Sequence, residues 1–283
     1  MKERENSDRI EHVSDTALMV AACRAIETGR EHGFVHDPFA EKLAGARGMT
    51  LAQNLPTVNV MCFGVGIRSL FLDELLLKAI AAAEIKSVLS LGSGLDSRPY
   101  RLDLPPDLHW IEVDFEDMLE YKAAVLANDR SRCRLERMPA DLNDPAARAA
   151  LFAGAADGAG LMITEGLLMY LPGSTVEALA AEAARSSIRR WILDVTSAPL
   201  AQRLHQGSWA DIESVRAAGH LRGAEVLDVP VRNGWSRLER RTYTVDGMPV
   251  VAARMKAEGA PPAPAPREPF PTDDPSGVYL FGR

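Results

Sequence analysis

The pattern of apolar and polar positions along the chain predicts buried strands that alternate with helices. Short apolar runs of the length that suits a buried strand occur at 88–91, 108–113, 135–139, 160–164 and 191–196. Between them, helix formers and helix-start signals predict helices over 116–127, from Asp144-Pro145 onward, and over 175–187 with Ser174 and Glu177 as a capping box. This alternation is typical of an α/β fold built on a parallel sheet.

The two ends of the chain depart from this alternation. Ahead of the first strand the pattern predicts a helix over 14–29, short helices and loops over 40–57, and a helix over 69–83 that Arg68 precedes. After the fifth strand it predicts a helix and loop over 198–220, a sixth strand at 226–231, an irregular proline-rich connector over 260–275 and a final strand over 277–283. Over 234–258 the pattern predicts no definite element.

Composition narrows the classes of partner. The 283 residues carry 32 Lys and Arg against 39 Asp and Glu, a net charge of −7, which argues against nucleic acid or an anionic membrane as the main partner. No uninterrupted apolar run approaches the roughly 18 residues of a membrane span, and the first residues are too charged for a signal peptide. We therefore expect a cytoplasmic protein without a membrane partner.

The cysteines and histidines predict no metal site. Cys23, Cys62 and Cys133 are odd in number and far apart, which is typical of buried thiols rather than of disulfides or a zinc site. His32 and His36 are four positions apart, but glycine and proline interrupt any helix that would align them. We interpret both as loop residues.

The first apolar run leads into a glycine turn, which indicates a ligand lying close to the backbone. Gly92, Ser93 and Gly94 follow that run at the point where a parallel strand ends. A dinucleotide site would carry a glycine at Ser97, and Asp96 would repel a pyrophosphate. S-Adenosylmethionine has an ammonium and a sulfonium but no phosphate, so it suits this carboxylate. The alternative is an acidic helix cap with solvated arginines after it.

Two later strand ends carry candidate nucleoside contacts. Asp114 lies 22 positions after Gly92, close to the separation of about 20 expected for an acidic residue that binds ribose hydroxyls. This spacing fits S-adenosylmethionine and NAD equally, and Asp114 could instead cap the helix that begins at Glu116. Asp141 and Leu142 follow the third strand and could bind an adenine amino group and cover its ring.

Arg24 and Arg68 are isolated cations in apolar surroundings, and Glu165 is a carboxylate at the end of the fourth strand. An unpaired charge away from water is costly, so each arginine needs an anionic partner. A shared ligand carboxylate would satisfy both, although an internal salt bridge is an equal alternative for Arg24. Glu165 would suit a cationic ligand group in the same crevice.

Taken together, these segments resemble the leucine carboxyl methyltransferase and tetracenomycin-type polyketide O-methyltransferase family. The resemblance covers 14–172 and rests on 16–27, 37–39, Arg68, 91–101, 112–115, 141–142 and 165–171. Beyond Ser197 we match nothing to the family.

The resemblance implies a class I methyltransferase fold and S-adenosyl-L-methionine as cofactor. That fold is a Rossmann-like, seven-stranded, mostly parallel sheet with helices on both faces and an N-terminal helical lid. We expect one domain over 1–283, with the lid in 1–83, the cofactor-binding core in 84–200 and substrate-side elements with the C-terminal strands in 201–283. The implied contacts are Arg24 and Arg68 for the cofactor carboxylate, Gly92, Ser93 and Gly94 for its methionine portion, Asp114 and Phe115 for the ribose, Asp141 and Leu142 for the adenine, and Glu165 for the amino group.

These observations predict an O-methyltransferase that acts on a carboxylate or hydroxyl of a small metabolite, with a polyketide-like secondary metabolite suggested by analogy. Alternatives are a protein C-terminal carboxyl methyltransferase, an NAD-dependent oxidoreductase and a binding protein that keeps the cofactor site without turnover. A general base such as His205 is needed only for a hydroxyl acceptor, and the sequence assigns no catalytic residue. An apolar acceptor pocket could be lined by a further set of residues, each of which could equally belong to the ordinary core: Met19, Met61, Phe63, Met169, Tyr170 and Trp209.

Overall fold

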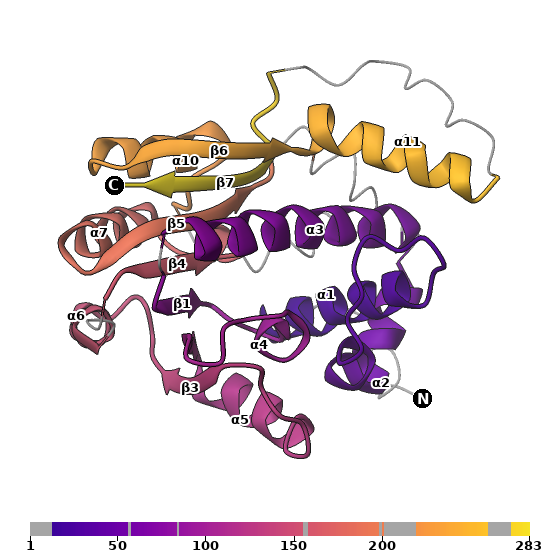
Figure 1. Ribbon diagram of the computed structural model, residues 1–283, viewed down its shortest axis with the longest axis horizontal. Coiled ribbons are helices and arrows are strands. Elements are labelled where there is room, and N and C mark those ends of the chain that lie inside the picture. The colour runs from indigo at the N-terminus through magenta and orange to yellow at the C-terminus, as the bar shows by residue number, and fades with distance from the viewer. Residues whose placement is uncertain are drawn as a thin grey trace.

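The computed structural model describes residues 13–55, 58–83, 85–154, 158–197, 200, 219–259 and 273–283. Its centre is a seven-stranded sheet in the order β3-β2-β1-β4-β5-β7-β6 (Figure 1). The strands are β1 Ser87–Leu91, β2 His109–Asp114, β3 Arg134–Pro139, β4 Gly160–Thr164, β5 Ile188–Val195, β6 Ser236–Thr242 and β7 Gly277–Gly282. The first five are parallel, and β7 runs antiparallel to both β5 and β6. The predicted seven-stranded, mostly parallel α/β fold is confirmed.

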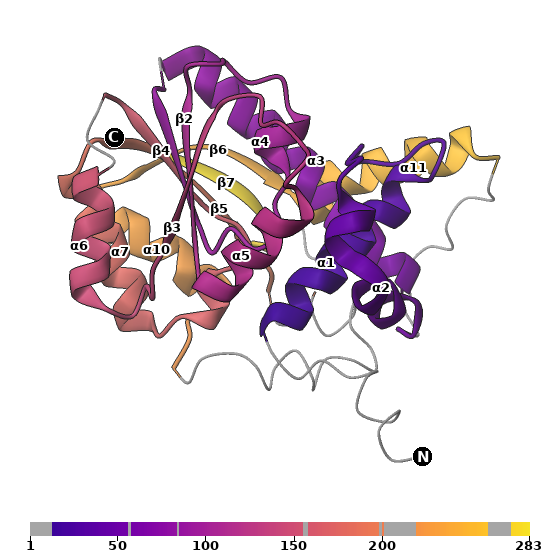
Figure 2. The same cartoon turned by 90° about the horizontal axis from the view of Figure 1, so that it is seen from below.

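Helices surround this sheet and extend one end of the molecule. They are α1 Val13–Thr28, α2 Ala40–Gln53, α3 Val58–Ala83, α4 Arg98–Arg101, α5 Glu116–Val125, α6 Pro145–Gly154, α7 Gly173–Arg185, α10 Ala224–Arg232 and α11 Met248–Ala257. A 3-10 turn, η1 Leu168–Tyr170, and a π-helical turn, η2 Tyr243–Gly247, complete the described elements. Figures 1 and 2 both place α1, α2 and α11 at the same end of the molecule.

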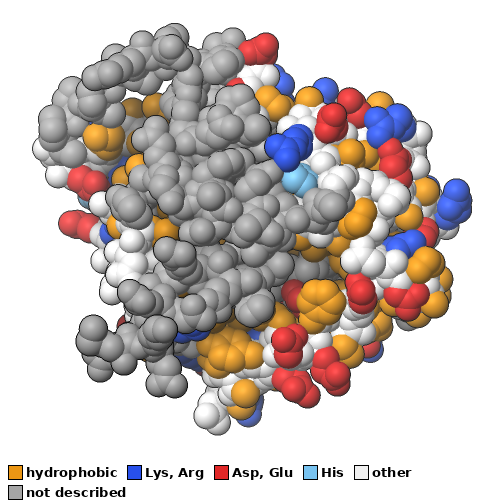
Figure 3. Space-filling model, turned by 180° about the vertical axis from the view of Figure 1, so that it is seen from behind, with side chains coloured by type: hydrophobic (Ala, Val, Ile, Leu, Met, Phe, Trp, Pro, Cys, Tyr) orange, Lys and Arg blue, Asp and Glu red, His pale blue; other side chains and the backbone are white. Residues whose placement is uncertain are grey.

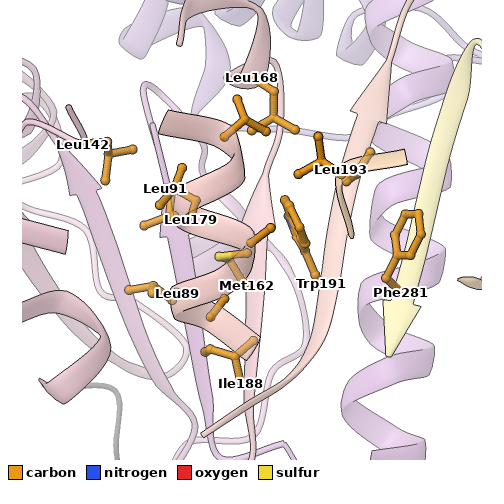
Figure 4. Packing of buried hydrophobic residues seen from close by; sticks show 14 of the residues in the cluster. Leu89, Leu91, Leu142, Met162, Leu168, Leu179, Ile188, Trp191, Leu193 and Phe281 are labelled. Carbon is orange, nitrogen blue, oxygen red and sulfur yellow. The ribbon is translucent and has the colours of Figure 1, made fainter. Parts of the chain in front are cut away.

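Alternate residues of the strands supply two cores, one on each face of the sheet. Leu89, Trp191 and Phe281 belong to the cluster beneath α6, α7 and α10, part of which Figure 4 shows. Their neighbours Val88 and Ile192 belong to the cluster beneath α3. Because successive side chains of a strand point to opposite faces, helices on both faces leave the central strands continuously apolar. That is why the sequence shows them as apolar runs.

The N-terminal helix was predicted correctly, but the helix expected from Ser69 was placed too late. The structure extends α3 back to Val58, so Arg68 lies inside the helix rather than before it. Gly64 and Gly66 weaken the local helix signal. Tertiary packing against α1 compensates, because the first half of α3 shares a buried cluster with that helix.

The sixth strand predicted at 226–231 is wrong, since these residues form α10. Val226 and Val229, three positions apart, are buried against the sheet as one helical face. The strand that the pattern missed is β6, at the edge of the sheet. An edge strand buries little of itself, so its polar sequence carried no strand signal. The final strand, β7, was predicted correctly.

The capping box expected at Ser174 does not form. The structure begins α7 at Gly173, and its N-cap, Pro172, makes no side-chain capping bond. Glu177 instead accepts a hydrogen bond from Asn233 Nδ2 at 2.8 Å and pairs with Arg232. The carboxylate therefore joins α7 to the end of α10 rather than capping its own helix.

Other helix predictions hold, and part of the C-terminal region lies beyond the described residues. The helix opened by Asp144 is confirmed as α6, with Asp144 Oδ1 accepting the Ala146 N–H at 2.9 Å. The expected helix and loop over 198–220 fall outside the described residues apart from Leu200 and 219–220, as does most of the connector over 260–275.

The described surface mixes charges of both signs. In the face shown in Figure 3, basic and acidic side chains lie among apolar ones, with acidic groups gathered along the lower edge. Within the described ranges, no helix is both long and apolar enough to cross a membrane.

Candidate functional site

A cavity of about 660 Å³ opens at the carboxyl ends of β1, β2, β3 and β4. This is where an open α/β sheet binds its ligands, because the chain leaves neighbouring strands β1 and β4 in opposite directions. Every residue predicted to contact the cofactor lines it: Arg24, Arg68, Gly92, Ser93, Gly94, Asp114, Phe115, Asp141, Leu142 and Glu165. Folding thus brings together side chains that the sequence spreads over more than half of the chain.

The glycine turn forms the floor of the cavity. Gly92 and Gly94 have φ values of 59° and 43°, a region that residues with a side chain rarely adopt. A Cβ on Gly92 would lie 2.6 Å from Leu167 Cδ1, so any other residue would displace that leucine as well as strain the backbone. The Cβ position of Gly94 is roomier, with Ala17 Cβ at 3.6 Å as its nearest neighbour. The turn therefore places its backbone at the wall of the cavity, where the sequence predicted a ligand.

Asp114 ties the end of β2 to this turn. Its Oδ2 accepts the Gly94 N–H at 2.7 Å and its Oδ1 accepts the Phe115 N–H at 2.8 Å. The alternative interpretation, a cap for α5, is not what the structure shows, since the N-cap of α5 is Phe115 and has no side-chain cap. Burial raises the pKa of Asp114, and the two N–H donors offset this only in part.

Arg68 and Glu165 form an ion pair in the wall of the cavity. Arg68 Nε lies 2.9 Å from Glu165 Oε1, and Arg68 Nη1 lies 3.5 Å from Asp194 Oδ2. Burial acts to raise the pKa of Glu165, but Arg98 and Arg68 outweigh it and hold that pKa below its usual range. Glu165 therefore presents a carboxylate, not a carboxylic acid, to the cavity.

Arg98 forms a second ion pair with the Glu165 carboxylate. It is buried, so the alternative interpretation of the glycine turn, in which solvated arginines follow an acidic cap, is wrong for this residue. Its side chain is 2% exposed, and its Nη1 lies 2.7 Å from Glu165 Oε2 and 3.1 Å from Asp96 Oδ2. Burial acts to raise the pKa of Asp96, but Arg98 outweighs it and lowers that pKa to about 2. Asp96 also accepts the Arg98 N–H at 3.0 Å, although the N-cap of α4 is Ser97 and makes no side-chain capping bond.

Arg24 forms the internal salt bridge considered for it and also lies at the cavity wall. Its Nε lies 2.8 Å from Asp37 Oδ2 and its Nη2 donates to the Leu95 carbonyl at 2.6 Å, while its side chain also lines the cavity. Burial acts to raise the pKa of Asp37, but Arg24 outweighs it and lowers the pKa. The internal salt bridge is therefore present, and it fixes the guanidinium beside the glycine turn.

Asp141 and Leu142 form the opposite end of the cavity. Asp141 Oδ1 accepts the Asn143 N–H at 2.9 Å, which shapes the turn after β3. Leu142 is buried in the core cluster beneath α7, so its side chain joins the cavity to the packed interior. Phe115, on the neighbouring strand end, is 56% exposed. An exposed aromatic ring beside a buried leucine suits a flat heterocycle.

The residues proposed for an apolar acceptor pocket also lie here. Five of them line the cavity: Met19, Met61, Phe63, Met169 and Tyr170. Trp209 and His205 lie outside the described residues.

Sequence reasoning missed Asp194, Tyr243 and Thr244. Asp194 is 6% exposed and accepts the Gly166 N–H at 2.6 Å, so it orders the turn that carries Glu165. One signal for it was available, an acidic residue inside an otherwise apolar strand. Tyr243 and Thr244 line the cavity from η2, a region where the pattern predicted no element.

The charges of the cavity fit S-adenosylmethionine. The charged lining residues are Arg24 and Arg68 against Asp96, Asp114, Asp141 and Glu165. A surplus of carboxylates complements a ligand whose sulfonium and ammonium outnumber its single carboxylate. Among the described residues no group of His, Cys, Asp or Glu is arranged to hold a metal ion.

The sequence matches a known protein family and several bacterial proteins. Residues 17–184 match the family model described as leucine carboxyl methyltransferase. A Streptomyces avermitilis protein is 38% identical over 184 residues, covering 61% of this chain and 64% of its own length. A Frankia alni protein is 38% identical over 177 residues, covering 58% and 61%. Both are named as candidate S-adenosyl-L-methionine-dependent methyltransferases. The matched region spans about three fifths of the length of these relatives.

Solved structures agree on the fold over nearly the whole chain. A DUF574-family protein from Streptomyces avermitilis superposes with a TM-score of 0.58 at 12% identity, covering 93% of this chain and 96% of that one. A candidate methyltransferase from Thermobifida fusca superposes with a TM-score of 0.57 at 16% identity, covering 98% and 95%. At such low identity these likenesses establish the architecture alone.

Proposed function

Because the chain belongs to the leucine carboxyl methyltransferase family, we propose that it is an S-adenosyl-L-methionine-dependent O-methyltransferase whose acceptor is a carboxylate or hydroxyl of a small metabolite. The names of the similar bacterial proteins support the cofactor. The observation that carries the proposal is the convergence of Asp114, Arg68 and Glu165 on one cavity around the glycine turn. A secondary metabolite as acceptor is suggested by analogy alone.

Each predicted contact has a chemical reason in this cavity. Asp114 is a carboxylate acceptor for ribose hydroxyls, and Leu142 and Phe115 offer apolar surfaces to the adenine. Glu165, ionised and held by two arginines, suits an ammonium group. The guanidinium groups of Arg24 and Arg68 suit a carboxylate. These assignments make helices α1 and α3, which supply the two arginines, part of the cofactor site as well as of its proposed lid.

When bound, the cofactor would supply an electrophilic methyl group. The task of this chain is then positioning, because a displacement in line with the sulfonium needs the acceptor oxygen held at near-attack distance. A carboxylate acceptor needs no base, whereas a hydroxyl must lose its proton. The apolar walls that Met19, Met61 and Phe63 contribute exclude water from the reacting atoms.

Methyl transfer tests the proposal directly. The protein is incubated with S-adenosylmethionine labelled in its methyl group and with a panel of phenols, alcohols and carboxylic acids, and labelled product is counted. We expect many turnovers with at least one member of the panel. Cofactor binding without any turnover would favour a binding protein instead, and tight NADH binding without S-adenosylmethionine binding would favour an oxidoreductase.

A further inference from the structure

The turn after the edge strand carries two hydroxyl groups that have no hydrogen-bond partner. Tyr243 and Thr244 begin η2 and both line the cavity. Tyr243 Oη and Thr244 Oγ1 are buried, and neither has a hydrogen-bond partner in the described structure. Native proteins satisfy nearly all buried hydroxyls, and π-helical turns are rare and frequently mark functional sites. Two adjacent unsatisfied groups at the edge of a ligand cavity indicate a ligand that completes them.

The turn is held firmly against α3. The Tyr243 ring lies nearly parallel to Phe71, with ring centroids 6.5 Å apart, and the Tyr243 N–H donates to the Ser276 carbonyl at 3.0 Å. A Cβ on Gly247 would lie 3.4 Å from Ile67 Cγ2, so backbone and helix are in close contact. Burial, and then Asp194, raise the pKa of Tyr243 well above its usual value. The phenol is therefore a hydrogen-bond donor and not a base.

The charges around the cavity disfavour an anionic acceptor. Its two described cations, Arg24 and Arg68, are the ones proposed for the cofactor carboxylate, and both also pair with carboxylates of the protein. The remaining charged residues that line it are carboxylates. A second carboxylate, in addition to that of the cofactor, would face repulsion and find no free cation on the described walls.

The walls next to the turn are apolar. Ile67 and Phe63 of α3 and Met248 and Val251 of α11 line the same cavity. Pockets of this composition bury a hydrophobic body and use a few polar groups to orient it.

We infer that the methyl acceptor is a neutral, largely apolar molecule with a hydroxyl group, and that Tyr243 and Thr244 are the positioning residues for its oxygen-bearing end. This inference rests on the proposed function and narrows it. The acceptor oxygen forms a bond to the methyl carbon, the carbon–sulfur bond breaks, and the products are a methyl ether, S-adenosylhomocysteine and a proton released to solvent.

A matched pair of acceptors tests the substrate class. Protein loaded with S-adenosylhomocysteine is titrated with 2-naphthol and with 2-naphthoate, which share one apolar scaffold, and labelled methyl transfer to each is measured with S-adenosylmethionine. We expect 2-naphthol to bind more tightly and to be methylated faster. A preference for 2-naphthoate, or binding of neither, would overturn the inference. Titration of S-adenosylmethionine into protein that has not been loaded with S-adenosylhomocysteine separates the two claims, since absence of that binding would instead refute the proposed function.

Single substitutions test the two hydroxyls. In Tyr243→Phe and Thr244→Val we expect the Kd of 2-naphthol to rise about three- to tenfold, the effect of one lost neutral hydrogen bond, while the Kd of S-adenosylhomocysteine stays unchanged. Tyr121→Phe is the control, because Tyr121 donates to the Leu43 carbonyl and does not line the cavity. Unchanged naphthol affinity in both variants, or a parallel loss of S-adenosylhomocysteine affinity, would contradict the assignment.

Discussion

Asp114 shows how single residues join the fold to the ligand site. It accepts one hydrogen bond from the glycine turn and lies at the cavity wall, so the same carboxylate fixes the turn and faces the cavity. Its spacing from Gly92 made it predictable, because the distance from a glycine turn to the end of the second strand varies little. Asp194 could not be identified in this way, since its partners, Arg68 and the Gly166 N–H, come from distant segments.

Asp114→Ala should weaken S-adenosylmethionine binding by about 1 to 3 kcal/mol, the scale for losing hydrogen bonds to a charged group. Isothermal titration measures the change. Asp117→Ala is the matched control, because Asp117 is an exposed acidic residue on the following helix and does not line the cavity. Equal affinities for wild type and both variants, with folding intact, would rule out the ribose contact.

The raised pKa of Asp114 gives the binding a pH dependence. Only the ionised carboxylate accepts from two ribose hydroxyls, so affinity should be constant near neutral pH and should fall as pH falls through the pKa of Asp114. Because burial raises that pKa, the fall should begin above the ordinary aspartate value of about 3.9. Burial also raises the pKa of Asp194, so Asp114→Asn is needed to separate the two groups. This variant should bind S-adenosylmethionine more weakly at neutral pH, and its affinity should lose the part of the acid dependence that Asp114 causes. An unaltered pH profile of the affinity would exclude Asp114 as the source of that dependence.

At the scale of elements, sequence patterns identified the strands that helices cover on both faces. They failed for elements whose burial depends on segments far away in the sequence. The central strands were predictable because two layers of helices keep them apolar. Strand β6 and helix α10 were not, because β6 is a polar edge strand and the burial of Val229 depends on the sheet beneath it. The cavity-lining turn η2 has no local signature, since its position depends on contact with α3.

A buried ion pair fastens α11 to the N-terminal helices. Arg254 Nη1 lies 2.7 Å from Glu27 Oε2, and its guanidinium lies 4.7 Å and 4.5 Å from the ring centroids of Phe34 and Phe63. Both charged side chains are almost fully buried. The pair therefore connects α11 to α1, and both helices contribute residues to the cavity wall.

Arg254→Met should lower the free energy of unfolding by about 3 kcal/mol, because it leaves Glu27 buried with one ionic partner fewer. Urea denaturation measures this change. Arg232→Met is the control, since Arg232 pairs with Glu177 at the surface and its loss should leave stability nearly unchanged. If the two variants were equally stable, α11 would not be held by this pair.

Across the whole molecule, sheet order decides where the ligand site lies. Strands β1 to β4 end at one edge, and the turns after them supply the glycines, Asp114, Asp141 and Glu165. The N-terminal helices and the β6–α11 connection also contribute residues to the cavity wall, and Figure 2 shows α1, α2 and α11 at one end of the molecule. All of the predicted cofactor contacts lie in the region that matches the family model, whereas η2 and α11, which also line the cavity, lie after it. The part of the cavity wall that comes from the N-terminal helices and the strand ends could thus be predicted from sequence, whereas the part that comes from η2 and α11 could not.

The central claim is that this cavity binds a sulfonium nucleoside, and isothermal titration with S-adenosylmethionine and NADH in parallel tests it most directly. We predict one molecule of S-adenosylmethionine bound per chain, displaced by S-adenosylhomocysteine, with no binding of NADH. Saturable NADH binding with no heat from S-adenosylmethionine would contradict the claim.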